Sequence, residues 1–175
     1  MAYCIQTLKG ISLDCESSMG GIKAVYIANF DDVKGVATDT SGEKITGFTM
    51  TEGAKFKAYQ FRKNTGSMTS TLTADETTGL NYVTTEVSLV FTKMETAKRV
   101  EMTALAQAQL AVIVLDSNGI YWYVTKDEYA AATTGTGETG TAKGDRNAYG
   151  LTLTAENNTY PFEVDAAAID SIIEA

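Results

Sequence analysis

The 175-residue sequence contains no histidine, one proline and two cysteines. Histidine serves most often as a general acid or base, so its absence excludes Ser–His–Asp catalysis and histidine-ligated zinc or iron. The cysteines, Cys4 and Cys15, have no CxxC or metal-ligand spacing, and we expect reduced, partly buried thiols rather than a disulfide scaffold. We therefore predict a protein that is not an enzyme, with no catalytic residue, cofactor or metal ion.

Long apolar runs and an excess of basic residues are also missing. No stretch approaches the roughly 18 apolar residues of a membrane span, and the N-terminus lacks the basic and apolar regions of a secretory signal. The net charge is −8, from 22 acidic and 14 basic residues. An acidic surface repels phosphate, so we expect neither specific nucleic-acid binding nor a membrane partner.

Period-two alternation of apolar and polar residues is abundant, and it predicts a mainly β chain. In the segment 81–92, Val83, Val87 and Leu89 share one face. The short connection 74–79 predicts that this segment pairs antiparallel with 67–73. We expect a loop over 33–42, where Gly and Ser interrupt the pattern. The remaining expected strands cover 22–30, 44–50, 54–61, 149–155 and 159–164.

The apolar spacing becomes helical after residue 92. Thr92-Lys93-Met94-Glu95 fits a capping box, and we predict one helix over 93–109. Its apolar face is expected to comprise Ala97, Val100, Ala104, Leu105 and Ala108. Asp165 is expected to cap a short C-terminal helix that runs to Ile173.

The segment Leu110 to Val124 has two apolar runs around Asn118-Gly119, which predicts a β-hairpin with a type I′ turn. Both runs are apolar on both faces, so the hairpin is expected to lie in the core. Its second run supplies a candidate aromatic surface for a carbohydrate, although core packing explains the same pattern. That surface consists of Tyr121, Trp122 and Tyr123.

Other sequence motifs are weak. The GxGxxG of Gly135 to Gly140 does not open a helix, so it fits a flexible loop better than a dinucleotide site. The acidic pairs 31–32, 75–76 and 127–128 occupy turn-like positions and mark no sugar cleft. We predict a single domain, 1–175, with an N-terminal arm (1–21) that lies on a neighbour or forms a strand, and an exposed Gly/Thr loop (133–144).

Between Ser67 and Val164, long strands are followed by one helix, an apolar hairpin, a Gly/Thr loop and closing strands. This order resembles the tail-tube (major tail protein) family of bacteriophage virion proteins. It also resembles virion proteins of gut-bacterial phages, in the run Asn-Tyr-Val-Thr-Thr-Glu-Val-Ser-Leu-Val-Phe-Thr-Lys and in the Tyr-Trp-Tyr hairpin. The resemblance implies an antiparallel β-sandwich or barrel with one flanking helix.

The resemblance also implies a subunit that self-assembles into stacked rings around a DNA channel. Its partners would be further copies of itself and other virion proteins, after synthesis in the cytoplasm of a host bacterium. The two polar loops are expected to order only against a neighbouring subunit. The candidate inter-subunit contacts are Asp75, Glu76, Thr77 and Gly79 in one loop and Thr136, Gly137, Glu138 and Gly140 in the other.

Two alternatives remain open from the residues alone. A capsid decoration or head–tail joining protein would bind a capsid lattice rather than stack on itself. A carbohydrate- or surface-binding β module would use the aromatic surface.

Overall fold

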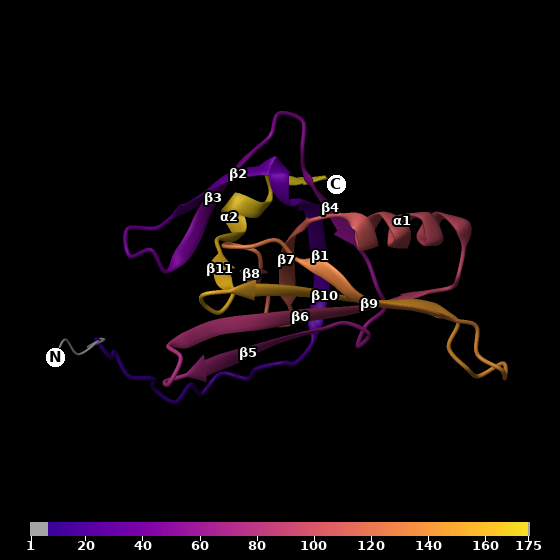
Figure 1. The fold of residues 1–175 in the computed structure, drawn as a ribbon, viewed down its shortest axis with the longest axis horizontal. Coiled ribbons are helices and arrows are strands. Elements are labelled where there is room, and N and C mark those ends of the chain that lie inside the picture. The colour runs from indigo at the N-terminus through magenta and orange to yellow at the C-terminus, as the bar shows by residue number, and fades with distance from the viewer. Residues whose placement is uncertain (1–6, 175) are drawn as a thin grey trace.

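The structure, a computed structural model, describes residues 7–174, so the expectation for Cys4 lies outside it. The chain forms two β-sheets and two α-helices, which confirms the mainly-β prediction with a flanking helix (Figure 1). The larger sheet has the order β12 (Ile173–Glu174), β4 (Phe56–Tyr59), β1 (Ile22–Asn29), β7 (Leu110–Asp116), β8 (Tyr121–Tyr123), β11 (Phe162–Val164), β3 (Lys44–Met50), β2 (Val33–Thr38).

The smaller sheet has the order β5 (Ser67–Asp75), β6 (Leu80–Thr92), β10 (Ala148–Asn157), β9 (Ala131–Glu138). All of its pairings are antiparallel, including the predicted pairing of β5 with β6. The larger sheet is antiparallel except where β11 joins β3 and β12 joins β4. A short 3-10 turn, Phe30–Asp32, connects β1 to β2.

Strand β7 lies between two hydrophobic cores. On one side Val112 and Val114 join the core that includes Leu89 of β6. On the other side Ala111 and Ile113 join the core around the short helix α2 (Ala166–Ile169). A strand with both faces buried must be apolar at every position, which explains the uninterrupted run and confirms that this hairpin is central.

Strand β6 has the predicted alternation, with its odd-numbered residues from Val83 to Phe91 buried. The same face of the small sheet is covered by the larger sheet and by α1 (Thr96–Gln107), which lies along β9 and β10. Because all of this packing is on one side, the opposite face of the small sheet has no layer on it from residues 7–174.

The predicted capping box is wrong. Thr92 is the last residue of β6, and the chain turns at Lys93, whose φ is 68°. Glu95 occupies the N-cap position without a side-chain cap, and it pairs instead with Lys98 at 2.9 Å. The helix therefore begins three residues later than predicted and ends two earlier.

The predicted apolar face of α1 is also wrong in part. Leu105 is buried and Met102 packs against the core, whereas Ala97, Val100 and Ala104 are exposed. The stripe that packs on the sheets runs instead through Met102, Leu105 and Ala108.

The β7–β8 turn differs in type from the I′ prediction. The backbone N–H of Gly119 donates to the carbonyl of Asp116 at 3.2 Å, and Gly119 alone in the turn has a positive φ, 89°. This is a type I turn followed by a glycine bulge. Asp116 favours it, because its carboxylate accepts hydrogen bonds from the N–H groups of Asn118 and Ile120.

Two segments expected to be loops are strands. Residues 33–38 form β2, which pairs with β3, and residues 131–138 form β9, which pairs with β10. The predicted Gly/Thr loop 133–144 is exposed, but it is irregular only from residue 139. Asp165 caps α2 as predicted, through Ala167 N–H at 3.3 Å, but α2 ends at Ile169.

Candidate functional site

The uncovered face of the small sheet carries mainly hydroxyl and carboxylate side chains. The strand register places Thr71 opposite Thr84, and Ser88 opposite Thr152, whose hydroxyls lie 3.1 Å apart. We call this surface the hydroxyl face. Its members are Ser67, Thr69, Thr71, Thr73, Thr84, Glu86, Ser88, Thr134, Thr136, Glu138, Thr152, Thr154 and Glu156.

None of the four strands of the small sheet contains lysine or arginine. The sheet does contain four acidic residues: Asp75, Glu86, Glu138 and Glu156. The four strands therefore give the hydroxyl face hydrogen-bonding groups and a net negative charge, which repels phosphate.

Both edges of the small sheet are open. Strands β5 and β9 end the sheet, and no further strand from residues 7–174 pairs with either. On β5, Leu72 is 47% exposed although its neighbour in the sheet, Val83, is buried. An open, partly apolar edge is a template for another strand.

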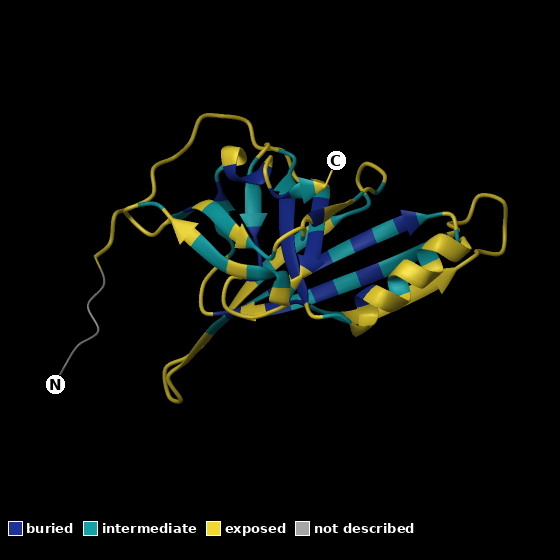
Figure 2. Ribbon diagram, turned by 90° about the horizontal axis from the view of Figure 1, so that it is seen from above, coloured by how far each residue is buried: buried dark blue, intermediate teal, exposed yellow. Residues whose placement is uncertain are grey.

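The N-terminal arm, residues 7–21, has no regular secondary structure, and every residue in it is exposed (Figure 2). Leu8, Ile11 and Leu13 are at least 90% exposed. Cys15 is exposed too, so the expectation of a partly buried thiol is wrong for this residue. An apolar segment that its own domain leaves uncovered is a strong candidate for contact with another chain.

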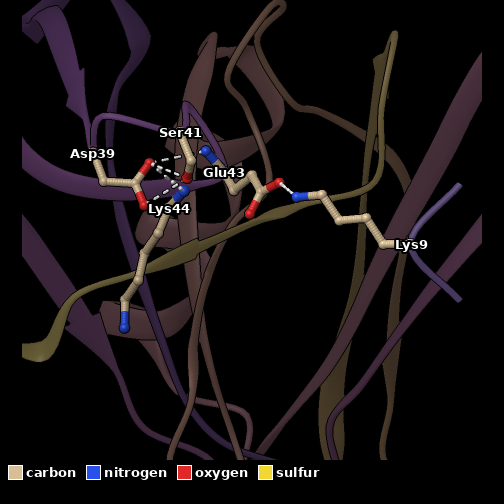
Figure 3. Close-up of polar contacts among 5 residues, drawn as sticks. All are labelled: Lys9, Asp39, Ser41, Glu43 and Lys44. Atoms are coloured by element: carbon tan, nitrogen blue, oxygen red, sulfur yellow. Dashed lines mark hydrogen bonds and ion pairs between the residues drawn. The ribbon is translucent and has the colours of Figure 1, made fainter. Parts of the chain in front are cut away.

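Contacts near both ends of the arm hold it to the domain. Lys9 forms an ion pair with Glu43 in the turn between β2 and β3, a contact that raises the pKa of Lys9 (Figure 3). In that turn Asp39 accepts hydrogen bonds from Ser41 Oγ and from the N–H of Glu43. Nearer the domain, Met19 N–H donates to the Asn118 side chain at 2.8 Å.

The first set of predicted contact residues lies in the β5–β6 turn. Asp75 ends β5, and its carboxylate accepts hydrogen bonds from the N–H groups of Thr77 at 2.8 Å and Thr78 at 3.4 Å. These bonds lower the pKa of Asp75. Glu76, Thr77 and Gly79 are exposed, and Gly79 has a φ of 70°. The turn is closed by its own hydrogen bonds, and its contact with a neighbouring subunit stays a prediction.

The second set is divided between a strand and a loop. Thr136, Gly137 and Glu138 belong to the open edge strand β9, whereas Gly140 lies in the irregular segment 139–147. A Cβ on Gly137 would lie 3.1 Å from the ring of Tyr149, so glycine lets this ring pack under β9.

The irregular segment also closes on itself. Asp145 accepts hydrogen bonds from the N–H groups of Thr141 and Ala142, both at 2.7 Å, and Arg146 pairs with Glu138. The structure brings neither set of predicted contact residues to the other, since they lie on different hairpins of the sheet.

The three aromatic residues of β8 do not form one surface. Tyr123 is 1% exposed and packs edge-on against Phe48, with ring centroids 5.0 Å apart. Trp122 lies on the opposite face of the strand, where its indole N–H donates to Asp116 at 3.0 Å. Tyr121 is half-buried against Tyr26. Alternation along the strand separates the side chains, and core packing is the better explanation.

Sequence reasoning missed the apolar residues of the arm and the hydroxyl face. The signal for the first was present: Ile11, Leu13 and Cys15 alternate with Ser12 and other polar residues. The hydroxyl face was hidden because β9 was expected to be a loop.

Within residues 7–174, no group of three or more Cys, Asp or Glu side chains is arranged to hold a metal ion. The helices described there are too short and too polar to cross a bilayer. No protein-family model, curated protein or solved structure matches this chain.

Proposed function

We propose that this protein is a non-enzymatic structural subunit of a bacteriophage virion, and that it self-assembles into stacked rings that form a tail tube around DNA. The observation that carries the proposal is the small sheet, with two open edges and a hydroxyl face whose four strands contain acidic residues but no lysine or arginine. A DNA channel needs a wall that does not bind phosphate, and such a face meets that need.

The exposed arm and the open edges support assembly. A subunit that stays monomeric leaves Leu8, Ile11 and Leu13 in water. Burying one such side chain is worth about 1.5–3 kcal/mol, so three of them favour association with a neighbour strongly. A contact between different surfaces of neighbouring copies closes into rings or continues as a filament.

The partners under this proposal are further copies of the chain and other virion proteins. The protein would be made in the host bacterial cytoplasm and reside in the virion. A capsid decoration or head–tail joining role uses the same exposed arm but predicts binding to a lattice instead of self-stacking.

Electron microscopy of the purified full chain over a concentration series, with mass measured by light scattering, tests the proposal. Rings or tubes of uniform diameter are the expected result. A chain that stays monomeric at every concentration and binds purified capsids would refute the tube and favour decoration.

A further inference from the structure

We propose that the arm of one copy adds as an antiparallel strand to the open β5 edge of a second copy, with residues 11–16 of the arm beside residues 67–72 of the edge. This inference deepens the proposed self-assembly, since it names the segment and the edge that join two subunits. In one chain the arm is exposed and the outer edge of β5 has no partner strand from the described residues.

The arm has the pattern of a strand without having a sheet. From residue 11 to residue 16 apolar and polar residues alternate strictly, with Ile11, Leu13 and Cys15 on one side. Ser12 and its polar counterparts, Asp14 and Glu16, are on the other. Such a period-two pattern is typical of a strand with one buried face. In the single chain that face is exposed.

The edge of β5 presents a matching row. Met68 and Leu72 point to the side of the small sheet that packs on the core, and Leu72 is nearly half exposed. An added strand whose apolar residues point to the same side would extend the core over Leu72.

Antiparallel pairing of the arm with β5 brings opposite charges together, whereas parallel pairing does not. The β5 strand follows Lys63 and leads to Asp75 and Glu76, so it runs from basic to acidic. The arm likewise runs from Lys9 to Asp14 and Glu16. Antiparallel pairing puts Lys9 near the acidic end of the edge and Glu16 toward its basic end, whereas parallel pairing would place like charges together.

The condition that the apolar arm residues point to the core side of the sheet also selects the register of the pairing. Directly opposite residues in an antiparallel pair point to the same side of the sheet. Placing Ile11 opposite Leu72 then places Leu13 opposite Ser70 and Cys15 opposite Met68. All three arm residues face the core side, and Lys9 lies opposite Ala74, next to Asp75.

A second copy, rather than the same one, is the occupant. In the single chain Lys9 is engaged by Glu43 and Met19 by Asn118, and the arm stands away from the sheets (Figure 2). A copy whose arm lies there leaves its own β5 edge open. The arm of the next copy fills that edge when its Lys9 exchanges Glu43 for the acidic end of β5. The arm and the β5 edge are different surfaces, so each copy can contact one neighbour through its arm and another through its edge. Such a contact extends from copy to copy into a ring or a filament.

Disulfide trapping between two distinguishable full-length copies tests the pairing. The first copy keeps Cys15 and carries a mass tag, and the second carries Cys15→Ser and Met68→Cys. Both carry Cys4→Ser. A Cβ–Cβ separation of opposite residues, about 4.5–5.5 Å, is close enough for a disulfide after a small adjustment. We expect a heterodimer on non-reducing gels, and its loss when Thr69→Cys, which points to the other face, replaces Met68→Cys.

A second pair guards against a folding defect at the partly buried Met68. Ile11→Cys on a tagged Cys15→Ser copy is mixed with Leu72→Cys on the other copy, with Thr71→Cys as its control. Leu72 is exposed enough that its substitution spares the core. Heterodimers at both core-facing positions support the register.

The outcomes separate this inference from the proposed function. Tubes without either heterodimer, or heterodimers that ignore which face of β5 carries the cysteine, would overturn the arm pairing and leave the tube standing. When Cys15 and Met68→Cys are placed in one copy, a disulfide between these two positions that forms only within single chains would also overturn it. Face-specific heterodimers without any ring or tube would support the pairing and reject the tube.

Discussion

The indole N–H of Trp122 donates a hydrogen bond to Asp116 Oδ2 at 3.0 Å, across the turn that the same carboxylate closes. Oδ1 of Asp116 accepts from the N–H groups of Asn118 and Ile120 at 2.8 and 2.9 Å. One side chain therefore fixes both the turn and the orientation of the tryptophan. Asn118, in the same turn, contacts the last residues of the arm, since its side chain accepts a hydrogen bond from Met19 N–H.

Replacing Asp116 with alanine is expected to lower the free energy of unfolding by about 3 kcal/mol, since it removes three hydrogen bonds to a charged acceptor. The protein has a single tryptophan, so urea unfolding followed by fluorescence reports directly on this site. Glu52→Ala, at an exposed turn, is the control and is expected to change little. An unchanged midpoint for Asp116→Ala would contradict the role given to the carboxylate.

Asn157 links the two sheets, because its Nδ2 donates to the Val124 carbonyl at 2.7 Å and its Oδ1 accepts from Asp127 N–H at 2.9 Å. Asn157→Leu leaves the buried Val124 carbonyl without its partner, which costs about 1–3 kcal/mol. Calorimetry should show a lower Tm. The exposed neighbour offers a matched control, Asn158→Leu, whose Tm should stay close to that of the parent.

Gly140 is required by backbone geometry. Its φ is 69°, and a Cβ there would lie 2.2 Å from the Cβ of Asp145. Gly140→Ala is expected to open the loop 139–147, because the left-handed conformation alone costs a non-glycine residue about 1–2 kcal/mol. Limited proteolysis should cut this loop about tenfold faster or more. Gly144→Ala, with open space around its Cβ, should be cut at the parental rate.

The β5–β6 turn is expected to lose stability in acid. Hydrogen bonds from Thr77 and Thr78 N–H hold the pKa of Asp75 below its ordinary value in the folded protein. A lowered folded pKa stabilises the turn above the unfolded pKa of about 3.9, and this contribution disappears as the pH falls through the folded pKa.

An NMR titration of the Asp75 carboxyl carbon measures this shift. Asp75→Asn should remove the part of the pH-dependent change in the Thr77 and Thr78 amide shifts that follows the Asp75 titration. Titration of Asp75 at the ordinary aspartate pKa would show that the two backbone hydrogen bonds do not form in solution.

The proposed channel predicts a gain of DNA binding on charge reversal. Glu86→Lys with Glu156→Lys places two cations on the hydroxyl face, where both residues are exposed, so stability should change by less than about 1 kcal/mol. Assembled particles of this variant should retain DNA at low salt and release it at high salt. Glu52→Lys with Asp170→Lys gives the same net charge away from the sheet. Equal DNA retention by both variants would argue against a channel lined by this face.

The sequence predicted those elements whose local pattern is unambiguous: strict alternation, two apolar runs around a turn, or a capping residue before a helix. The long alternation of β6, the apolar hairpin of β7 and β8 and the Asp165 cap of α2 were all confirmed. Each of these elements is determined by residues close together in the sequence, so the sequence alone is enough to predict it.

The missed strands depend on partners far along the chain. Residues 131–138 look like a loop because Gly135 and Gly137 lower the strand signal, yet pairing with β10 makes them β9. Gly137 is explained by the ring of Tyr149 beneath the strand, which no local window reveals. Likewise β10 and β11 are neighbours in sequence but belong to different sheets.

The prediction of one aromatic surface was wrong for a related reason. A run of three aromatic residues was treated as one feature, although alternate residues of a strand face opposite ways. Tyr123 therefore contributes to the core and Trp122 to the turn.

The position of β7 between two cores has a consequence for how the domain unfolds. Losing the packing of Val112 and Val114 on one side removes the support of Ala111 and Ile113 on the other, since all four belong to a single strand. Neither half can melt while the other persists. The domain should therefore unfold in one cooperative transition, and the amides of β7 should be among the last to exchange with solvent.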